Sequence, residues 1–152
     1  MTHNKKKCLI ALLLTTAIFT GCSKQDDLPL LDKLEAEISI NDLNLESETI
    51  DAKEHWIFRT QVNSIEEGFV SHSKTSDKLQ DVIVVKTSDI KSTIDSIEKY
   101  KSECLELYSK GFWGKDSESA ANNLILNTKD DYVYFIATEN SSDIEKKILK
   151  AL

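Results

Sequence analysis

The 152-residue sequence is poor in proline, glycine and cysteine, with one proline, four glycines and three cysteines. So little proline and glycine excludes a collagen-like or low-complexity chain. Three cysteines, at positions 8, 22 and 104, are too few for the framework of a small disulfide-rich fold. With 40% hydrophobic and 30% charged residues, the composition is that of one globular domain.

Basic residues and long apolar runs are also scarce. The sequence has 19 Lys and Arg residues and 26 Asp and Glu residues, which gives a net charge of -7. Nucleic-acid binding depends on positive charge that neutralises phosphates, so we expect no nucleic-acid partner. The apolar stretch at residues 8–19 has twelve residues, whereas a membrane-spanning helix needs about 20.

The first 22 residues have the layout of a targeting signal. Three lysines precede the short apolar stretch, and Thr20, Gly21 and Cys22 follow it, which is the order of a secretory signal peptide. The cysteine directly after Gly21 resembles the lipobox of bacterial lipoproteins, although that motif usually has Leu at the position of Phe19. The resemblance implies cleavage between Gly21 and Cys22 and attachment of a diacylglyceryl group to the Cys22 thiol.

This interpretation predicts the domain organisation and the location. We expect residues 1–21 to be removed as a signal peptide, residues 22–28 to form the lipidated cysteine and a short tether, and residues 29–152 to form a single α+β domain. Two acyl chains hold a protein lastingly in a bilayer, so the protein would sit at the cell membrane, on its extracytoplasmic side. An ordinary secreted protein and an uncleaved anchor helix stay open as alternatives.

Negative charge is concentrated next to the expected anchor. Without residues 1–21 the chain has 16 basic and 26 acidic residues, a net charge of -10, and residues 26–51 hold nine acids against one lysine. The block lacks the glycine of a calcium-binding EF-hand loop. We interpret it as a solvated face, with cation binding or a basic envelope partner as alternatives.

Apolar spacing predicts an α+β fold. The expected sheet is small and mainly antiparallel, has about four strands in the order ββαββα with helices on one face, and follows short N-terminal helices. Helices are expected at 29–39, 52–60, 89–109 and the C-terminus, and strands at 67–73, 82–85, 124–126 and 132–137. Residues 41–49 are expected to form a loop. Ser88 is the expected cap of the long helix, Ser142 and Glu145 form the capping box of the last one, and Cys104 faces the core.

This layout resembles a family of small bacterial lipoproteins known as domain of unknown function 4358. The resemblance is carried by an early leucine-rich helix, the strand at 81–86, the helix ending at Tyr108, and the strands at 124–126 and 132–133. Where the family tends to have glutamate and isoleucine entering the middle strand, this chain has Asp81 and Val82. The family has no established chemistry, so the resemblance implies a lipoprotein domain and no catalytic residues.

The sequence has no recognisable catalytic motif. It lacks H-E-x-x-H, G-x-S-x-G and a glycine-rich phosphate loop, and no ligand spacing indicates a metal. We interpret His55 as a surface helix residue, and His72 as a strand residue whose side chain points away from Ser71 and Ser73. We therefore expect no catalytic residue, no metal and no cofactor, while a glycosidase-like pair of carboxylates stays open.

Two large aromatics, Phe112 and Trp113, lie between Gly111 and Gly114. If exposed, they suit a contact with a partner or insertion at a membrane interface; the alternative, which we favour, is that they fold back over the end of the sheet. The chain is thus expected to be a non-catalytic binding or protein-interaction module at the cell envelope, with an envelope protein or cell-wall component as partner. The alternative is an envelope hydrolase or an accessory subunit of a cell-wall enzyme.

Overall fold

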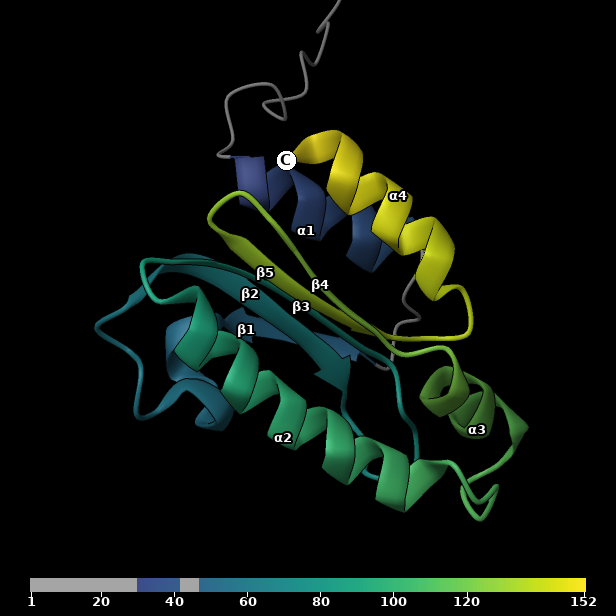
Figure 1. Ribbon diagram of the computed structural model, residues 1–152. Coiled ribbons are helices and arrows are strands. Elements are labelled where there is room, and N and C mark those ends of the chain that lie inside the picture. The colour runs from purple at the N-terminus through teal and green to yellow at the C-terminus, as the bar shows by residue number, and fades with distance from the viewer. Residues whose placement is uncertain (1–29, 42–46) are drawn as a thin grey trace, which may run out of the picture.

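The computed structural model describes residues 30–41 and 47–152, so the expected signal peptide, the cleavage site at Gly21 and the lipidation site at Cys22 lie outside it. Figure 1 shows the elements in chain order. They are α1 (Leu30–Asn41), β1 (Ser47–Asp51), the 3₁₀ helices η2 (Ala52–Glu54) and η3 (Trp56–Phe58), β2 (Ile65–Ser73), β3 (Asp81–Thr87), α2 (Ile90–Tyr108), α3 (Lys115–Asn122), β4 (Ile125–Lys129), β5 (Tyr132–Ala137) and α4 (Ser141–Ala151).

The strands form one sheet in the order β1-β2-β3-β5-β4, and every neighbouring pair is antiparallel. The predicted α+β class is therefore confirmed, with five strands rather than about four. The additional strand, β1, falls partly in the stretch expected to be a loop. Its backbone pairs with β2, with Thr49 opposite Ser71. The sequence of β1 shows no clear alternation of apolar and polar residues. This edge strand is held by its backbone pairing with β2 rather than by a buried apolar face.

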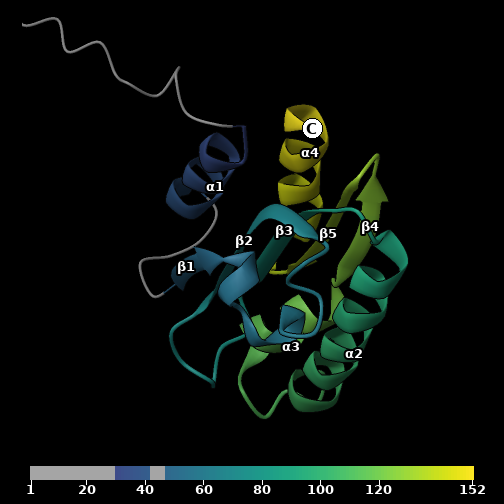
Figure 2. The same ribbon diagram turned by 90° about the vertical axis from the view of Figure 1, so that its left-hand side faces the viewer.

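Helices cover both faces of the sheet, and the expectation that they lie on one face is wrong. α1 and α4 pack on one side, and α2, α3 and the two 3₁₀ helices pack on the other (Figures 1 and 2). The cause is the central strand β3, whose residues 82–85 are apolar at every position and fully buried. Successive side chains point to opposite faces, so an uninterrupted apolar strand needs cover on both.

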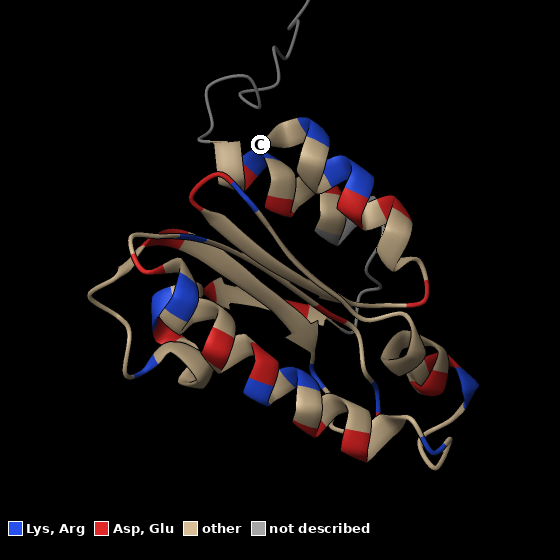
Figure 3. Ribbon diagram, viewed as in Figure 1, with Lys and Arg blue, Asp and Glu red and all other residues tan. Residues whose placement is uncertain are grey.

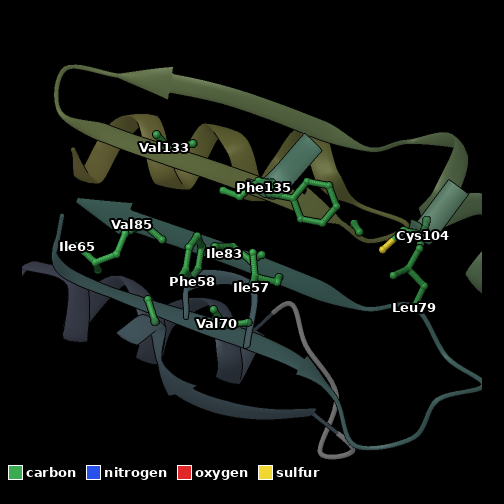
Figure 4. Packing of buried hydrophobic residues seen from close by; sticks show 14 of the residues in the cluster. Ile57, Phe58, Ile65, Val70, Leu79, Ile83, Val85, Cys104, Val133 and Phe135 are labelled. Atoms are coloured by element: carbon green, nitrogen blue, oxygen red, sulfur yellow. The ribbon is translucent and has the colours of Figure 1, made fainter. Parts of the chain in front are cut away.

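The larger core lies between the sheet and α2. Phe58, Ile83 and Phe135 meet there without exposure to solvent (Figure 4). Cys104 of α2 joins this core and is 2% exposed, which confirms its expected position. Full burial of each such apolar side chain contributes about 1.5–3 kcal/mol.

The second core joins the two ends of the described chain. α1 contributes Leu34 and Ile38, α4 contributes Ile144 and Ile148, and Tyr134 of β5 lies between the helices and the sheet. The helix predicted at 29–39 is thus confirmed. Within residues 30–41 and 47–152, no helix combines the length and the apolar composition needed to cross a bilayer.

Two helix starts differ from the expected caps. Asp89, not Ser88, caps α2, because its Oδ1 accepts a hydrogen bond of 3.1 Å from the Ser92 N–H. α4 begins at Ser141, after Asn140, and the carboxylate of Glu145 accepts a hydrogen bond of 3.0 Å from the Tyr134 hydroxyl. Glu145 is therefore engaged with the sheet rather than in a capping box.

The helix α3 was not expected. Its buried side chains, Ser117, Ala120 and Ala121, are small and stand at helical spacing. The Ser117 hydroxyl accepts a hydrogen bond of 3.1 Å from the Leu79 N–H and thereby ties α3 to the loop before β3. A buried helix face built from serine and alanine gives no hydrophobic periodicity, which is why the sequence pattern did not show it.

Gly68 of β2 allows the segment around Ala52 to lie close against the sheet. A Cβ at position 68 would lie 2.6 Å from the Val84 carbonyl oxygen and 2.9 Å from the Val85 Cα. Both are backbone atoms of the central strand and cannot move without disturbing the sheet.

We expect Gly68→Ala to lower the free energy of unfolding by about 1–3 kcal/mol, because the added methyl group overpacks this contact. Urea denaturation measures the change. Glu66→Ala in the same strand is the control; it removes only the exposed ion pair between Glu66 and Lys86, and we expect a clearly smaller loss of stability. Equal losses in the two variants would contradict the close approach at Gly68.

Candidate functional site

The loop between α2 and α3 presents Phe112 and Trp113 to solvent. Gly111 and Gly114 adopt φ angles of +71° and +93°, a region that favours glycine. The Gly114 N–H donates to the Gly111 carbonyl at 3.2 Å and closes a tight turn. Phe112 is 83% exposed and Trp113 is 46% exposed. The favoured expectation that both fold back over the sheet is therefore wrong, because the sheet is already covered by the residues of its two cores.

A second feature is a pocket of about 480 Å³ at the end of the sheet where β2 ends and β3 begins. Its walls come from η2 and η3, the β2–β3 loop and α2. The lining includes both histidines of the described chain together with Trp56 and Tyr100. Sequence spacing did not predict this convergence, because the histidines lie 17 positions apart on different elements.

His55 is 7% exposed, so its interpretation as a surface helix residue is wrong. It lies between the two 3₁₀ helices, where its Nδ1 accepts a hydrogen bond of 3.4 Å from the Ile57 N–H. Its pKa is lowered from 6.5 to about 4. Burial is the main cause, and the neighbouring His72 is the second cause of the same shift. The imidazole of His55 is therefore neutral at pH 7, with its proton on Nε2.

His72 lies beside His55, with their ring centroids 5.9 Å apart. Its Nδ1–H donates to the Ser73 carbonyl at 2.9 Å, and its Nε2 lies 3.4 Å from Glu48 Oε1. This contact is an ion pair when the ring is protonated. In the protonated ring, both nitrogens of His72 therefore have protein partners.

The inner wall of the pocket contains a buried carboxyl group. The Tyr100 hydroxyl donates a hydrogen bond to Asp81 Oδ2, and Asp81 is 4% exposed. Burial raises the pKa of Asp81 above its usual 3.8, although the hydrogen bonds and His72 act in the opposite direction. Burial also raises the pKa of Tyr100, and it raises that of Cys104 to about 12.

The ring nitrogens of the two histidines contact backbone groups and one carboxylate. Within the described part of the chain, no hydroxyl or thiol hydrogen-bonds to a ring nitrogen of either histidine, so no activated nucleophile is assembled there. The Cys104 thiol is buried, and its high pKa keeps it protonated. Residues 30–41 and 47–152 also contain no group of three His, Cys, Asp or Glu side chains that could hold a metal.

Two acids of the N-terminal block have local structural partners. Glu48 pairs with His72, and Asp51 Oδ1 accepts a hydrogen bond of 2.8 Å from the Lys53 N–H at the start of η2. These contacts help to hold the segment that carries His55. Several other acids of the block, including Asp26, Asp42 and Glu46, lie outside the described residues.

Comparison with known proteins gives no relative from which a function could be transferred. No protein-family model, no curated protein and no solved structure matches the chain. The candidate sites therefore depend on their own geometry.

The buried carboxyl of Asp81 predicts a pH dependence of stability. Because its pKa is raised in the folded protein, the folded state keeps a proton that the unfolded chain loses as the pH rises above 3.8. Asp81 therefore makes wild-type stability fall with rising pH in this range. Asp81→Asn keeps an oxygen that accepts the Tyr100 hydrogen bond but does not titrate.

We expect the stability of Asp81→Asn relative to the wild type to increase from pH 4 to pH 8. Urea denaturation across this range measures it, with the exposed Asp95→Asn as the control variant. If the difference in unfolding free energy between Asp81→Asn and the wild type did not change with pH, the carboxyl of Asp81 would have the same pKa in the folded and unfolded states, and the prediction would be wrong.

Proposed function

We propose that this chain is a lipoprotein anchored through Cys22 at the extracytoplasmic side of the cell membrane, where it serves as a non-catalytic binding or protein-interaction module. Two independent features support the proposal. One is the signal-like N-terminus, in which Cys22 follows Gly21 directly after a short apolar stretch. The other is the exposed loop that carries Phe112 and Trp113. The partner proposed for this loop is an envelope protein or a cell-wall component.

The observation that most directly supports a binding role is that the side chain of Phe112 is 83% exposed. The glycines on both sides of the loop hold it in a turn with positive φ, so the ring is displayed by a defined backbone. Large aromatics are enriched at protein interfaces, where a few of them contribute much of the binding energy. Phe112 and Trp113 therefore suit a contact surface.

The position of the loop also fits a contact away from the membrane. α1, the first described element after the proposed tether, packs with α4 on one side of the sheet, and the α2–α3 loop lies at the opposite side of the molecule (Figures 1 and 2). Residues 22–29 span at most about 26–29 Å when extended. A lipid at Cys22 would thus hold the α1 side near the bilayer and leave Phe112 facing outward.

The alternative of an envelope hydrolase is favoured by one observation, the presence of His55 and His72 beside Asp81 in one pocket. The contacts of these groups weigh against it. The Nδ1 of His55 accepts from the Ile57 N–H, the Nε2 of His72 faces the carboxylate of Glu48 rather than open space, and the carboxyl of Asp81 is hydrogen-bonded by Tyr100. A general base needs a free lone pair within reach of the proton that it removes.

The lipid anchor is tested by Cys22→Ser, with Cys8→Ser as the matched control. Cys8 lies in the expected signal peptide, so its replacement leaves the proposed lipidation site intact. We expect Cys22→Ser to move the protein from the membrane fraction to the soluble fraction, while Cys8→Ser stays with the membrane, as measured by fractionation and immunoblotting. Retention of Cys22→Ser in the membrane fraction would overturn the proposed anchor.

The contact surface is tested by placing a photoreactive amino acid at position 112 and, as a control, at position 149. Leu149 of α4 is 41% exposed and lies on the other side of the sheet. In intact cells we expect a discrete crosslinked product from position 112 and none from position 149. Trp113→Ala should abolish the product while leaving the melting temperature unchanged, because Trp113 lies outside both cores.

Identical products from both positions would indicate random collisions. That result, or a product insensitive to Trp113→Ala, would refute the proposed contact surface. Mass spectrometry of the product identifies the partner as an envelope protein or a cell-wall component.

A further inference from the structure

The pocket beside His55 has the size of a site for a small molecule. Its volume of about 480 Å³ falls within the range of ligand pockets, about 300–1,000 Å³. A second hollow of about 240 Å³ adjoins it, and the two share Trp56, Arg59 and Tyr100. Its lining contains neither Phe112 nor Trp113, although Lys78 also borders the hollow beside Trp113.

The rim of the pocket is basic on an otherwise acidic chain. Acidic and basic residues are interspersed along the ribbon (Figure 3). Arg59, Lys74 and Lys78 all line this pocket, and Glu54 is the exposed acid of its lining. The carboxyl of Asp81 lies deeper and is hydrogen-bonded by Tyr100. Burial favours the neutral form of Asp81, which limits its repulsion of an anion. Clustered cations beside a concave surface favour an anionic ligand.

The buried imidazole of His55 adds a hydrogen-bond donor. Because Nδ1 accepts from Ile57, the Nε2 of the neutral ring carries the proton, and this N–H has no hydrogen-bond partner among the described residues. This atom is not among the fully buried polar atoms without a partner, so it is open to the pocket, and an oxygen of a bound ligand can replace water as its acceptor.

The tyrosines that line the pocket present their rings to it, because their hydroxyl groups already have hydrogen-bond partners. The hydroxyl of Tyr100 is bonded to Asp81, and that of Tyr108 donates to the Ser76 carbonyl at 2.7 Å. Trp56 is 48% exposed and stands at 80° to the Tyr100 ring, with their centroids 5.8 Å apart. A half-exposed indole at the mouth of a pocket is suited to stack against a flat ring.

We infer that this pocket binds a small ring compound carrying an oxyanion, with Arg59 and the His55 Nε2–H contacting the oxyanion and Trp56 stacking on the ring. The ring is that of a saccharide or of an aromatic compound, because both have a flat face with apolar C–H or π character. The oxyanion is a phosphate, which arginine binds through paired charged hydrogen bonds.

The test uses three probes: inorganic phosphate, glucose 6-phosphate and phenyl phosphate. Isothermal titration calorimetry with the intact chain in neutral detergent measures their affinities. We expect at least one ring-bearing probe to bind about tenfold more tightly than inorganic phosphate, because the ring adds contact with Trp56. Tighter binding of glucose 6-phosphate assigns the site to saccharides, and tighter binding of phenyl phosphate assigns it to aromatic compounds.

Two variants separate the contribution of Arg59 to the binding affinity from that of Trp56. Arg59→Gln should weaken binding of every probe by about tenfold, because a charged hydrogen bond is lost. Trp56→Ala should reduce the affinity of the ring-bearing probes to that of inorganic phosphate. Lys91→Gln and Leu149→Ala, at exposed positions that do not line the pocket, are the matched controls and should bind as the wild type does.

A spectroscopic measurement on the wild type avoids dependence on variant folding. In ¹H–¹⁵N spectra of the imidazole groups, the probe that binds more tightly should shift the Nε2 resonance of His55. An unshifted His55 resonance at saturation would overturn the inference, as would equal affinity for all three probes or an Arg59→Gln variant that binds like the wild type. None of these results bears on Cys22 or Phe112, so they leave the proposed function untouched.

Discussion

The uninterrupted apolar sequence of β3 is the constraint on which the rest of the structure depends. Residues 82–85 present valine or isoleucine to both faces of the sheet, and none of them touches water. A central strand of this kind needs a helical layer on each side. The chain meets this need with its long helix α2 on one face and with α1 and α4, its first and last described helices, on the other.

This arrangement also determines where the pocket forms. α2 crosses the face occupied by Phe58 and Ile83, and the 3₁₀ segment reaches the same face because Gly68 leaves room for Ala52. The approach of these two elements at the end of the sheet brings His55 and Trp56 to Tyr100. The pocket is therefore a result of how the large core is closed at one end.

The sequence predicted those elements whose own residues bear a strong pattern. β5 has the predicted bounds, and α2 differs by one residue at each end, because both have apolar or β-branched residues at the spacing of their element. β1 was not predicted, since it depends on pairing with β2, and α3 buries only small side chains. The burial of His55 and its contact with His72 depend on tertiary packing that no local pattern encodes. The exposure of Phe112 is a similar case, because positive φ at its neighbouring glycines turns the loop outward.

The pairing of α1 with α4 has a mechanical consequence. The two helices contact each other and share one core, so the first and last described elements close the same face of the sheet (Figure 2). A pulling force applied at the N-terminal end of the domain acts first on α1 and is resisted by Leu34 and Ile38 in that core. Detachment of α1 would uncover the apolar face of β2 at Phe69 while leaving α2 and the opposite core in place. Under tension, the layer of α1 and α4 would therefore unfold before the layer of α2, which contains the pocket.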